Sequence, residues 1–252
     1  MGAPDPRAVG RAIEALHTDL QKARNALPAV RAALDLHRPD ETIIAGLLLH
    51  PQPAALLELV ATVPPWCRNA VLLGRVVLNP GAEQRLSLRL IPSLYWRDLA
   101  AVAAAPRVPP PVRQSAEEAL RDRLSDLRPG ERTTLARLAT APILTLLLAD
   151  HDPRVLEACL PNPRLRQDQL EDALRRTNAS RSLVEAVAAS SRWGSVYSIR
   201  LTLVLQPRTP LHAALKQITS LEHHDLRRVA GAKGLPPLVQ AAARAVLDRG
   251  SR

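Results

Sequence analysis

Short apolar patterns of helical period recur along the chain, and proline separates one from the next. After Pro210, for example, Leu211, Ala214, Leu215 and Ile218 fall on one face of a helix. Proline pushes the residue before it out of the α region, and proline itself is tolerated in the first turn of a helix. The pattern therefore predicts many short helices whose ends lie at prolines.

One form of this boundary occurs four times, as Leu49-His50-Pro51, Leu78-Asn79-Pro80, Pro161-Asn162-Pro163 and Leu205-Gln206-Pro207. Combining these boundaries with the apolar period gives a full set of expected elements. We expect helices over residues 7–26, 28–36, 40–49, 54–62, 67–78, 82–92, 95–104, 110–124, 130–140, 143–149, 154–160, 167–176, 181–189, 195–205, 210–219, 223–231 and 236–249.

The chain contains an internal repeat. Residues 66–120 align without a gap onto residues 193–247, at an offset of 127, and 18 of the 55 positions are identical. That is roughly three times the identity expected by chance for this composition. A weaker match extends upstream. The repeat predicts two related halves, residues 1–126 and residues 127–252.

Helices this short are marginally stable alone, because nucleation is costly and each apolar face must be buried against a neighbour. Stacking them in a row buries these faces. The composition agrees with helices, since the chain has no Phe, one Met, three Trp and two Tyr and must fill its interior with small aliphatic residues. We therefore expect an all-α protein: an α-solenoid, a superhelical stack of short helices built from two tandem homologous halves packed as one continuous solenoid.

One segment carries a family resemblance. Residues 148–158 place Asp152-Pro153 before a helix, and Asn162-Pro163 follows that helix. This unit resembles the bacterial HEAT-like and leucine-rich-variant α-helical repeats, and the likeness recurs less completely over residues 200–207. The resemblance implies an architecture shared by proteins of unrelated function. Some leucine-rich-variant proteins hold an iron–sulfur cluster on a cysteine-rich segment, but this chain has two cysteines, so we expect no cofactor.

The positive charge is unevenly distributed. The formal net charge is +10 and the pI is near 10.9, but only three of the 34 basic residues are Lys, a bias that a GC-rich genome would also produce. Residues 1–126 hold 15 basic and 13 acidic side chains, whereas residues 127–252 hold 19 and 11. The second half is thus at +8 and the first at +2, which favours an acidic partner for the second half.

We therefore assign a candidate binding surface to the second half, for a protein partner or a nucleic acid. A solvated arginine-rich face and a phosphate-binding face that releases counterions both remain open. The candidate residues are Arg175, Arg176, Arg192, Trp193, Arg200, Arg208, Lys216, Arg227 and Arg228.

The tryptophans suggest two different roles. Trp66 and Trp193 occupy equivalent positions before a helix, so we expect them to act as packing wedges. For Trp193 an aromatic platform for a base or a partner side chain is the alternative. Tyr95 and Trp96 align with polar residues in the second half, which predicts a surface position and a partner contact in the first half, with a partly buried wedge as the alternative.

No motif indicates catalysis. His223-His224-Asp225 resembles the His-Asp pair of metal-dependent phosphohydrolases, but the aligned positions hold an aspartate and neither histidine. We therefore expect the aspartate to favour a helix start and both histidines to be exposed and free of metal. Glycine-rich phosphate loops, GxSxG, HExxH and EF-hand patterns are absent from the sequence.

Three functional hypotheses follow. The first is a non-enzymatic scaffold that binds a protein partner. The second is a nucleic-acid-binding protein that uses the basic second half, and the third is an enzyme similar to the HEAT-like DNA glycosylases, none of whose local motifs occurs here. Cysteine usage and the absence of an apolar leader or spanning run predict a cytoplasmic protein without a membrane partner.

Overall fold

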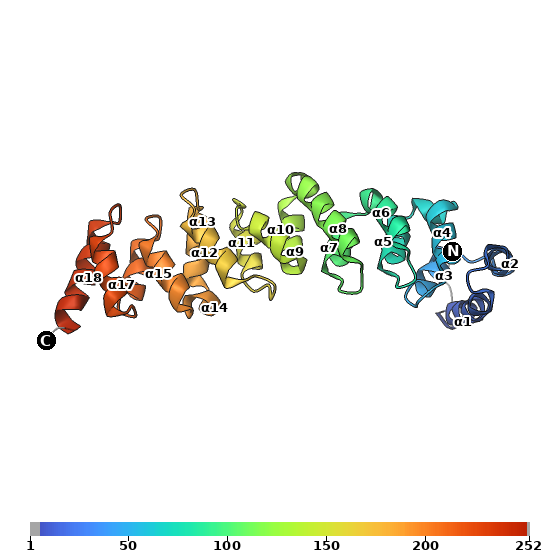
Figure 1. Cartoon of the computed structure of the whole chain (residues 1–252), viewed down its shortest axis with the longest axis horizontal. Helices are drawn as coiled ribbons and strands as arrows, with labels where there is room; N and C mark the ends of the chain where they lie inside the picture. The colour runs from blue at the N-terminus through green and yellow to red at the C-terminus, as the bar shows by residue number, and fades with distance from the viewer. Residues whose placement is uncertain (1–5, 251–252) are drawn as a thin grey trace. The chain divides into compact units, whose positions relative to one another are not determined.

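The computed structural model describes residues 6–250, whose helices are labelled in Figure 1. The chain forms two compact units, Met1–Ser125 and Asp126–Arg252. Over the described residues the chain is all-helical and has no strand, as predicted. Unit 1 contains α1 (Pro6–Ala23), α2 (Leu27–His37), α3 (Glu41–Leu47), α4 (Ala54–Thr62), the 3-10 helix η1 (Trp66–Arg68), α5 (Ala70–Leu78), α6 (Gln84–Leu90), η2 (Ile91–Ser93), α7 (Trp96–Ala104) and α8 (Pro110–Arg123).

Another 3-10 helix, η3 (Leu124–Asp126), spans the boundary between the units. Unit 2 then contains α9 (Pro129–Leu138), α10 (Ala141–Leu147), α11 (Pro153–Cys159), α12 (Gln167–Arg175), α13 (Arg181–Ala189), α14 (Ser191–Gly194), α15 (Tyr197–Leu205), α16 (Leu211–Ile218), α17 (His223–Gly231) and α18 (Pro237–Gly250).

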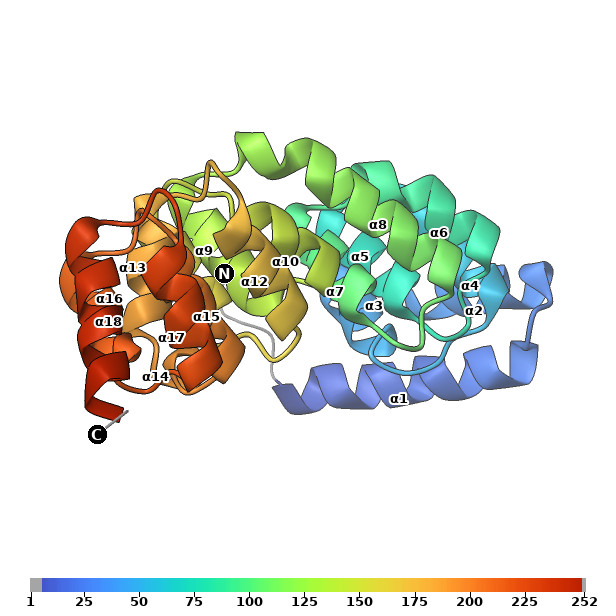
Figure 2. The same cartoon turned by 60° about the vertical axis from the view of Figure 1, so that its left-hand side comes forward.

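Within each unit, helices pack against their neighbours in two series. In unit 1 one series passes from α1 to α3, α5 and α7, while α2 packs on α4 and α6 on α8. In unit 2 one series passes from α10 to α12, α15 and α17, while the other contains α9, α11 and α13, and α16 packs on α18 (Figure 2). Each short helix therefore buries its apolar face against helices from other parts of the sequence. The superhelical stack of both halves stays a prediction.

Polar side chains at the helix starts explain why the elements begin where they do. The Asp40 carboxylate accepts a hydrogen bond from the Ile43 backbone N–H at 2.8 Å, which caps α3. The Asn69 side chain accepts from two backbone N–H groups at the start of α5. The predicted helix 67–78 is consequently two elements, η1 and α5, because Asn69 ends one and caps the other.

Asn79, which precedes Pro80 in the recurrent boundary motif, makes tertiary hydrogen bonds that the motif itself did not predict. The Asn79 side chain donates to the Leu48 and His50 carbonyls at 3.2 and 2.8 Å and accepts from the Gln52 and Gly81 N–H groups. This side chain is buried. It therefore fastens the end of α5 to the turn after α3.

Asn162 and Gln206 make similar connections in unit 2. The Asn162 amide donates to the carbonyls of Ala136 and Ala139, and the Gln206 amide donates to the Leu174 carbonyl. Because each bond joins positions more than 20 residues apart, the recurrent boundary connects successive helix pairs.

The helix bounds of the two units agree at the offset of 127. This holds at both ends for α4 and α13, α5 and α15, α7 and α17, and α8 and α18. The shared bounds agree with the alignment of residues 66–120 onto 193–247, while the common origin of the two halves stays a prediction.

Candidate functional site

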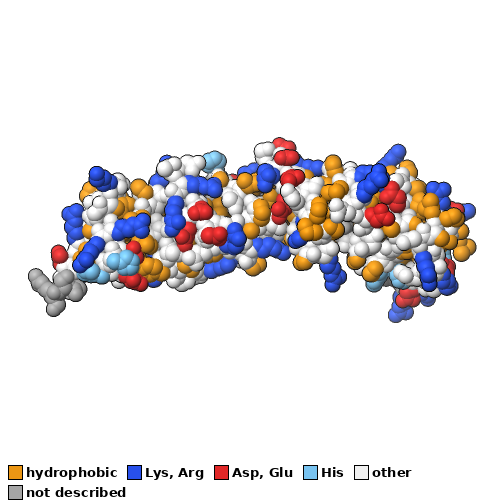
Figure 3. Space-filling view, in the orientation of Figure 1, with side chains coloured by type: hydrophobic (Ala, Val, Ile, Leu, Met, Phe, Trp, Pro, Cys, Tyr) orange, Lys and Arg blue, Asp and Glu red, His pale blue; other side chains and the backbone are white. Residues whose placement is uncertain are grey.

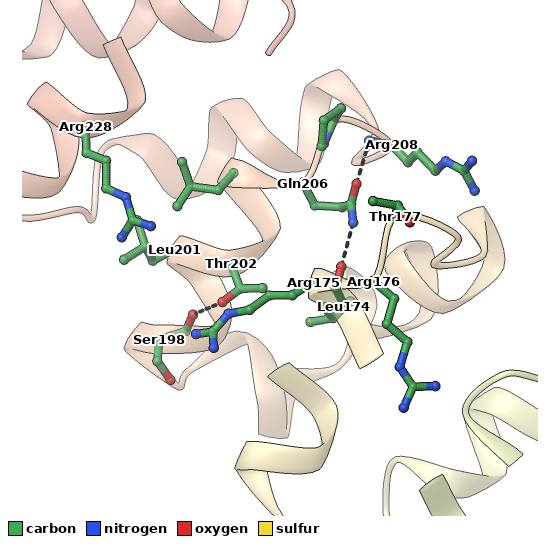
Figure 4. Close-up of a pocket in the computed structure, with 12 residues that line it drawn as sticks. Leu174, Arg175, Arg176, Thr177, Ser198, Leu201, Thr202, Gln206, Arg208 and Arg228 are labelled. Atoms are coloured by element: carbon green, nitrogen blue, oxygen red, sulfur yellow. Dashed lines mark hydrogen bonds between the residues drawn. The ribbon is translucent and has the colours of Figure 1, made fainter. Parts of the chain in front are cut away.

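The candidate site is a pocket of about 510 Å³ in unit 2, formed by α12, α15, α17 and the turns that follow α12 and α15 (Figure 4). It brings together four of the nine residues predicted from the sequence. The lining consists of Leu174, Arg175, Arg176, Thr177, Ser198, Leu201, Thr202, Leu205, Gln206, Pro207, Arg208 and Arg228. We call this site the arginine pocket.

Local structure explains how these arginines reach one site. Arg175 is the last residue of α12, and Arg176 follows in an extended conformation. Arg208 lies in the turn after Pro207, which the Gln206 hydrogen bond to Leu174 holds close to the end of α12. Arg228 lies on α17, which packs against α15.

One of the four charges is neutralised locally. The Arg175 guanidinium donates to the Glu171 carboxylate at 2.8 Å, and that carboxylate is largely buried. Burial raises the pKa of Glu171. Hydrogen bonds from Ser198 and Gln167 and the charge of Arg175 lower it by more, so the pKa of Glu171 lies below its usual range. Arg175 therefore contributes little net charge to the pocket.

The other three arginines lack a carboxylate partner among residues 6–250. Arg208 donates to the Ala179 carbonyl at 2.8 Å, which is a neutral acceptor. The side chains of Arg176 and Arg228 are exposed and make no hydrogen bond or ion pair within the described chain. Asp and Glu are absent from the pocket lining. The pocket consequently carries an uncompensated positive charge.

The floor of the arginine pocket is aliphatic. Leu174 is fully buried beneath it, and Leu201 and Leu205 of α15 are half-buried. The lining residues of α15 are at positions 198, 201, 202 and 205, which is the spacing of one helix face. The sequence therefore did contain a signal for this floor. The sequence analysis missed the floor because the spacing alone does not show which face of α15 its neighbouring helices leave open.

Trp193 belongs to the core, whereas Arg192 lies exposed beside it. The Trp193 ring is 4% exposed and its Nε1 donates to the Leu160 carbonyl at 2.9 Å. The Arg192 guanidinium lies 4.5 Å from the ring centroid and donates to the carbonyls of Leu160 and Asn162. For Trp193 the packing wedge is confirmed and the aromatic platform is wrong, because the residue is buried; Trp66 is only half-buried.

The remaining basic candidates lie apart from the pocket lining. Arg200 stacks at 5.5 Å on the ring of Tyr197. Lys216 lines a different pocket, between α13 and α16, that also contains Arg181 and Glu185. Arg227 is exposed on α17 beside Arg228. Figure 3 shows Lys and Arg spread over the visible surface with acidic groups among them.

The predicted surface position is correct for Tyr95 and wrong for Trp96. Tyr95 is 49% exposed, as a partner contact requires, but Trp96 is 2% exposed and is among the largest buried side chains. Alignment with an exposed His223 suggested a surface position for Trp96. The prediction failed because the Trp96 ring packs into the core of unit 1, in a chain that has no Phe for this purpose, whereas the aligned His223 side chain of unit 2 faces the solvent.

His223 and His224 are exposed, as predicted. His224 lies 3.2 Å from the Asp225 carboxylate, which accepts a hydrogen bond of 2.6 Å from the Tyr197 hydroxyl. Burial and the bond to Asp225 raise the pKa of Tyr197. Within the described part of the chain, His, Cys, Asp and Glu form no group of three or more that could hold a metal. Asp225 instead joins α15 to α17.

The two cysteines are unpaired thiols, one in each unit. Cys159 is buried, and burial together with the charge of Asp150 raises its pKa to about 12. Because the thiolate is the reactive form, Cys159 is unreactive at neutral pH.

Comparisons with models of protein families, with curated proteins and with solved structures find no match to this chain. The likeness to HEAT-like and leucine-rich-variant repeats therefore rests on the motifs of the sequence and stays a prediction. Among residues 6–250, every helix is too short or too polar to cross a bilayer.

Proposed function

We propose that this protein is a non-enzymatic helical-repeat scaffold that binds a protein partner through the α12, α15 and α17 face of unit 2. The observation that carries this proposal is the arginine pocket, where three arginines without carboxylate partners surround an aliphatic floor. An exposed site of this kind gains both electrostatic and apolar contacts when a complementary surface covers it.

The lining chemistry supports binding over catalysis. The pocket contains guanidinium, hydroxyl, amide and aliphatic groups, and it contains neither histidine nor a carboxylate. Two of its three hydroxyls are engaged, since Ser198 accepts from the Gln167 amide and Thr202 donates to the Ser198 carbonyl. The carboxylate that Ser198 contacts, Glu171, is paired with Arg175 and has a lowered pKa, so it is a weak general base for that hydroxyl.

Nucleic acid is the second candidate, and the net charge of +8 in residues 127–252 favours it. The distribution of the basic residues favours it less. Arg192 and Arg200 stack on rings, and Lys216 lies between α13 and α16, away from the arginine pocket. The pocket lining contains no aromatic ring on which a base could stack. A protein partner is therefore the better supported choice.

The test presents the whole chain with a random peptide library and, separately, with random-sequence RNA and duplex DNA. We expect selected peptides whose binding weakens when Arg176 and Arg228 are both changed to Ala. The matched control is Arg227→Ala, which removes one exposed guanidinium of α17 outside the pocket.

Nucleic acid binding would make a different prediction for the same variants. If tight binding of DNA is found, and its log–log salt slope flattens by about two in the Arg176→Ala, Arg228→Ala double variant, nucleic acid replaces the protein partner as the ligand. Weak DNA binding that is equal in the wild type, the double variant and Arg227→Ala would support the scaffold.

A further inference from the structure

The arginine charges around the pocket are spread out. Figure 4 shows Arg175 lying across the pocket toward Ser198, Arg176 and Arg208 pointing outward at one end, and Arg228 at the α17 end. A single phosphate group would need several guanidinium groups aimed at one point. The observed arrangement instead fits several anionic groups placed along an extended ligand.

The floor between these charges selects for aliphatic groups. Leu201 and Leu205 are half-buried on α15, which packs against α12 and against α17, the helix that holds Arg228. Covering them removes apolar surface from water, which stabilises a complex in proportion to the area buried. A ligand therefore gains most when an aliphatic side chain lies between its anionic groups.

Unit 1 shows that the helix frame does not require these arginines. The positions 127 residues before Arg176, Arg208 and Arg228 are Leu49, Gly81 and Ala101. The side chains of Arg176 and Arg228 also make no hydrogen bond within the described chain, so their guanidinium groups contribute little to the fold. A composition bias of the genome would act on both halves, yet the charge excess is in the second.

From these observations, and resting on the proposed function, we infer that the arginine pocket binds an acidic peptide segment of the partner that carries a leucine-sized side chain. The aliphatic side chain contacts Leu201 and Leu205. The carboxylates on either side of it pair with Arg176 and Arg208 at one end and with Arg228 at the other.

The experiment measures fluorescence anisotropy of labelled synthetic peptides with the whole chain. The first peptide alternates pairs of glutamate with single leucines; a second has glutamine in place of glutamate, and a third has alanine in place of leucine. We expect the first peptide to bind about tenfold more tightly than either control. A single-stranded oligonucleotide of the same formal charge is the fourth probe.

Variants locate the binding. Arg176→Ala with Arg228→Ala should weaken binding of the first peptide about tenfold, and Leu201→Ala should reduce its preference over the alanine peptide. Arg227→Ala, the matched control on the same helix, should leave the affinity within about twofold. The far-ultraviolet circular dichroism of each variant confirms that the helices are retained.

The outcomes separate the inference from the proposed function. Equal affinity for the glutamate and glutamine peptides, no binding of the glutamate–leucine peptide, or equal losses in the Arg227 and pocket variants would overturn the acidic ligand while leaving a protein partner in place. Binding of the oligonucleotide alone, weakened by the pocket substitutions, would overturn both.

Discussion

The face made by α3, α5 and α7 in unit 1 and the face made by α12, α15 and α17 in unit 2 have closely similar helix bounds but different chemistry. Aligned residues differ where the arginine pocket lies: Arg176, Arg208 and Arg228 of unit 2 face the solvent, where unit 1 has Leu49, Gly81 and Ala101. Unit 1 instead exposes Leu49 at 70% and Val71 at 56%. The two faces therefore share a similar set of helices and differ in the chemistry of a few exposed positions.

A second difference lies beneath these faces. In unit 2 the Asp225 carboxylate accepts a hydrogen bond from the Tyr197 hydroxyl, and the position aligned with Gly74 is Leu201. In unit 1 the aligned Asp98 lies against Gly74, and burial raises its pKa. The glycine is needed because a Cβ at position 74 would lie 2.8 Å from the Asp98 carboxyl carbon. Each unit therefore accommodates the same aspartate in its own way.

The largest expected difference between the units concerns the aligned tryptophans. Trp193→Ala should cost about 3–5 kcal/mol of unfolding free energy, because it removes a buried ring and the hydrogen bond to Leu160. Trp66→Ala should cost clearly less, because that ring is only half-buried. Urea unfolding followed by circular dichroism measures both, with Tyr95→Ala as an exposed aromatic control. Similar losses for both tryptophans would show that their environments are equivalent after all.

A smaller change in stability is expected at Gly81, the unit 1 position that aligns with Arg208. A Cβ at Gly81 would lie 2.0 Å from the Gln52 carbonyl oxygen, so Gly81→Ala should destabilise the protein by about 1–3 kcal/mol. Gly10→Ala is the control, since a Cβ there meets nothing within 4 Å, and a gain of up to about 1 kcal/mol is expected in a helix. If both variants unfold at the same urea concentration, the close approach at Gly81 is not a constraint.

The smallest expected effect is a pH dependence of stability that arises from Asp98, the unit 1 counterpart of Asp225. Burial raises the folded-state pKa of Asp98 above 3.8, so the folded state binds a proton more tightly than the unfolded state. The resulting stabilisation is complete below pH 3.8 and is lost as pH rises through the folded pKa. Asp98→Asn should remove this decline, so that the variant gains stability over the wild type as pH rises. Thermal unfolding across this range measures it, and parallel profiles would contradict the role of burial.

The sequence determined the fold class and much of the helix pattern. Proline and apolar period located most helices within a few residues, because these signals act on the local backbone. Pairing of helices was not local: Asn79 binds carbonyls about 30 residues earlier, and no spacing rule shows that partner. For the same reason the alignment misled at Trp96, whose burial depends on what packs around it in unit 1.

For the candidate site, the sequence identified an arginine excess in the second half but did not show which arginines act together. Arg176, Arg208 and Arg228 are separated by tens of residues, and only the packing of α12, α15 and α17 brings them around one floor. The structure also distinguished Arg175, which Glu171 neutralises, from its neighbour Arg176. Charge and period are properties of the chain, whereas the partner of each charge depends on the tertiary structure, because side chains from distant helices meet only after those helices pack.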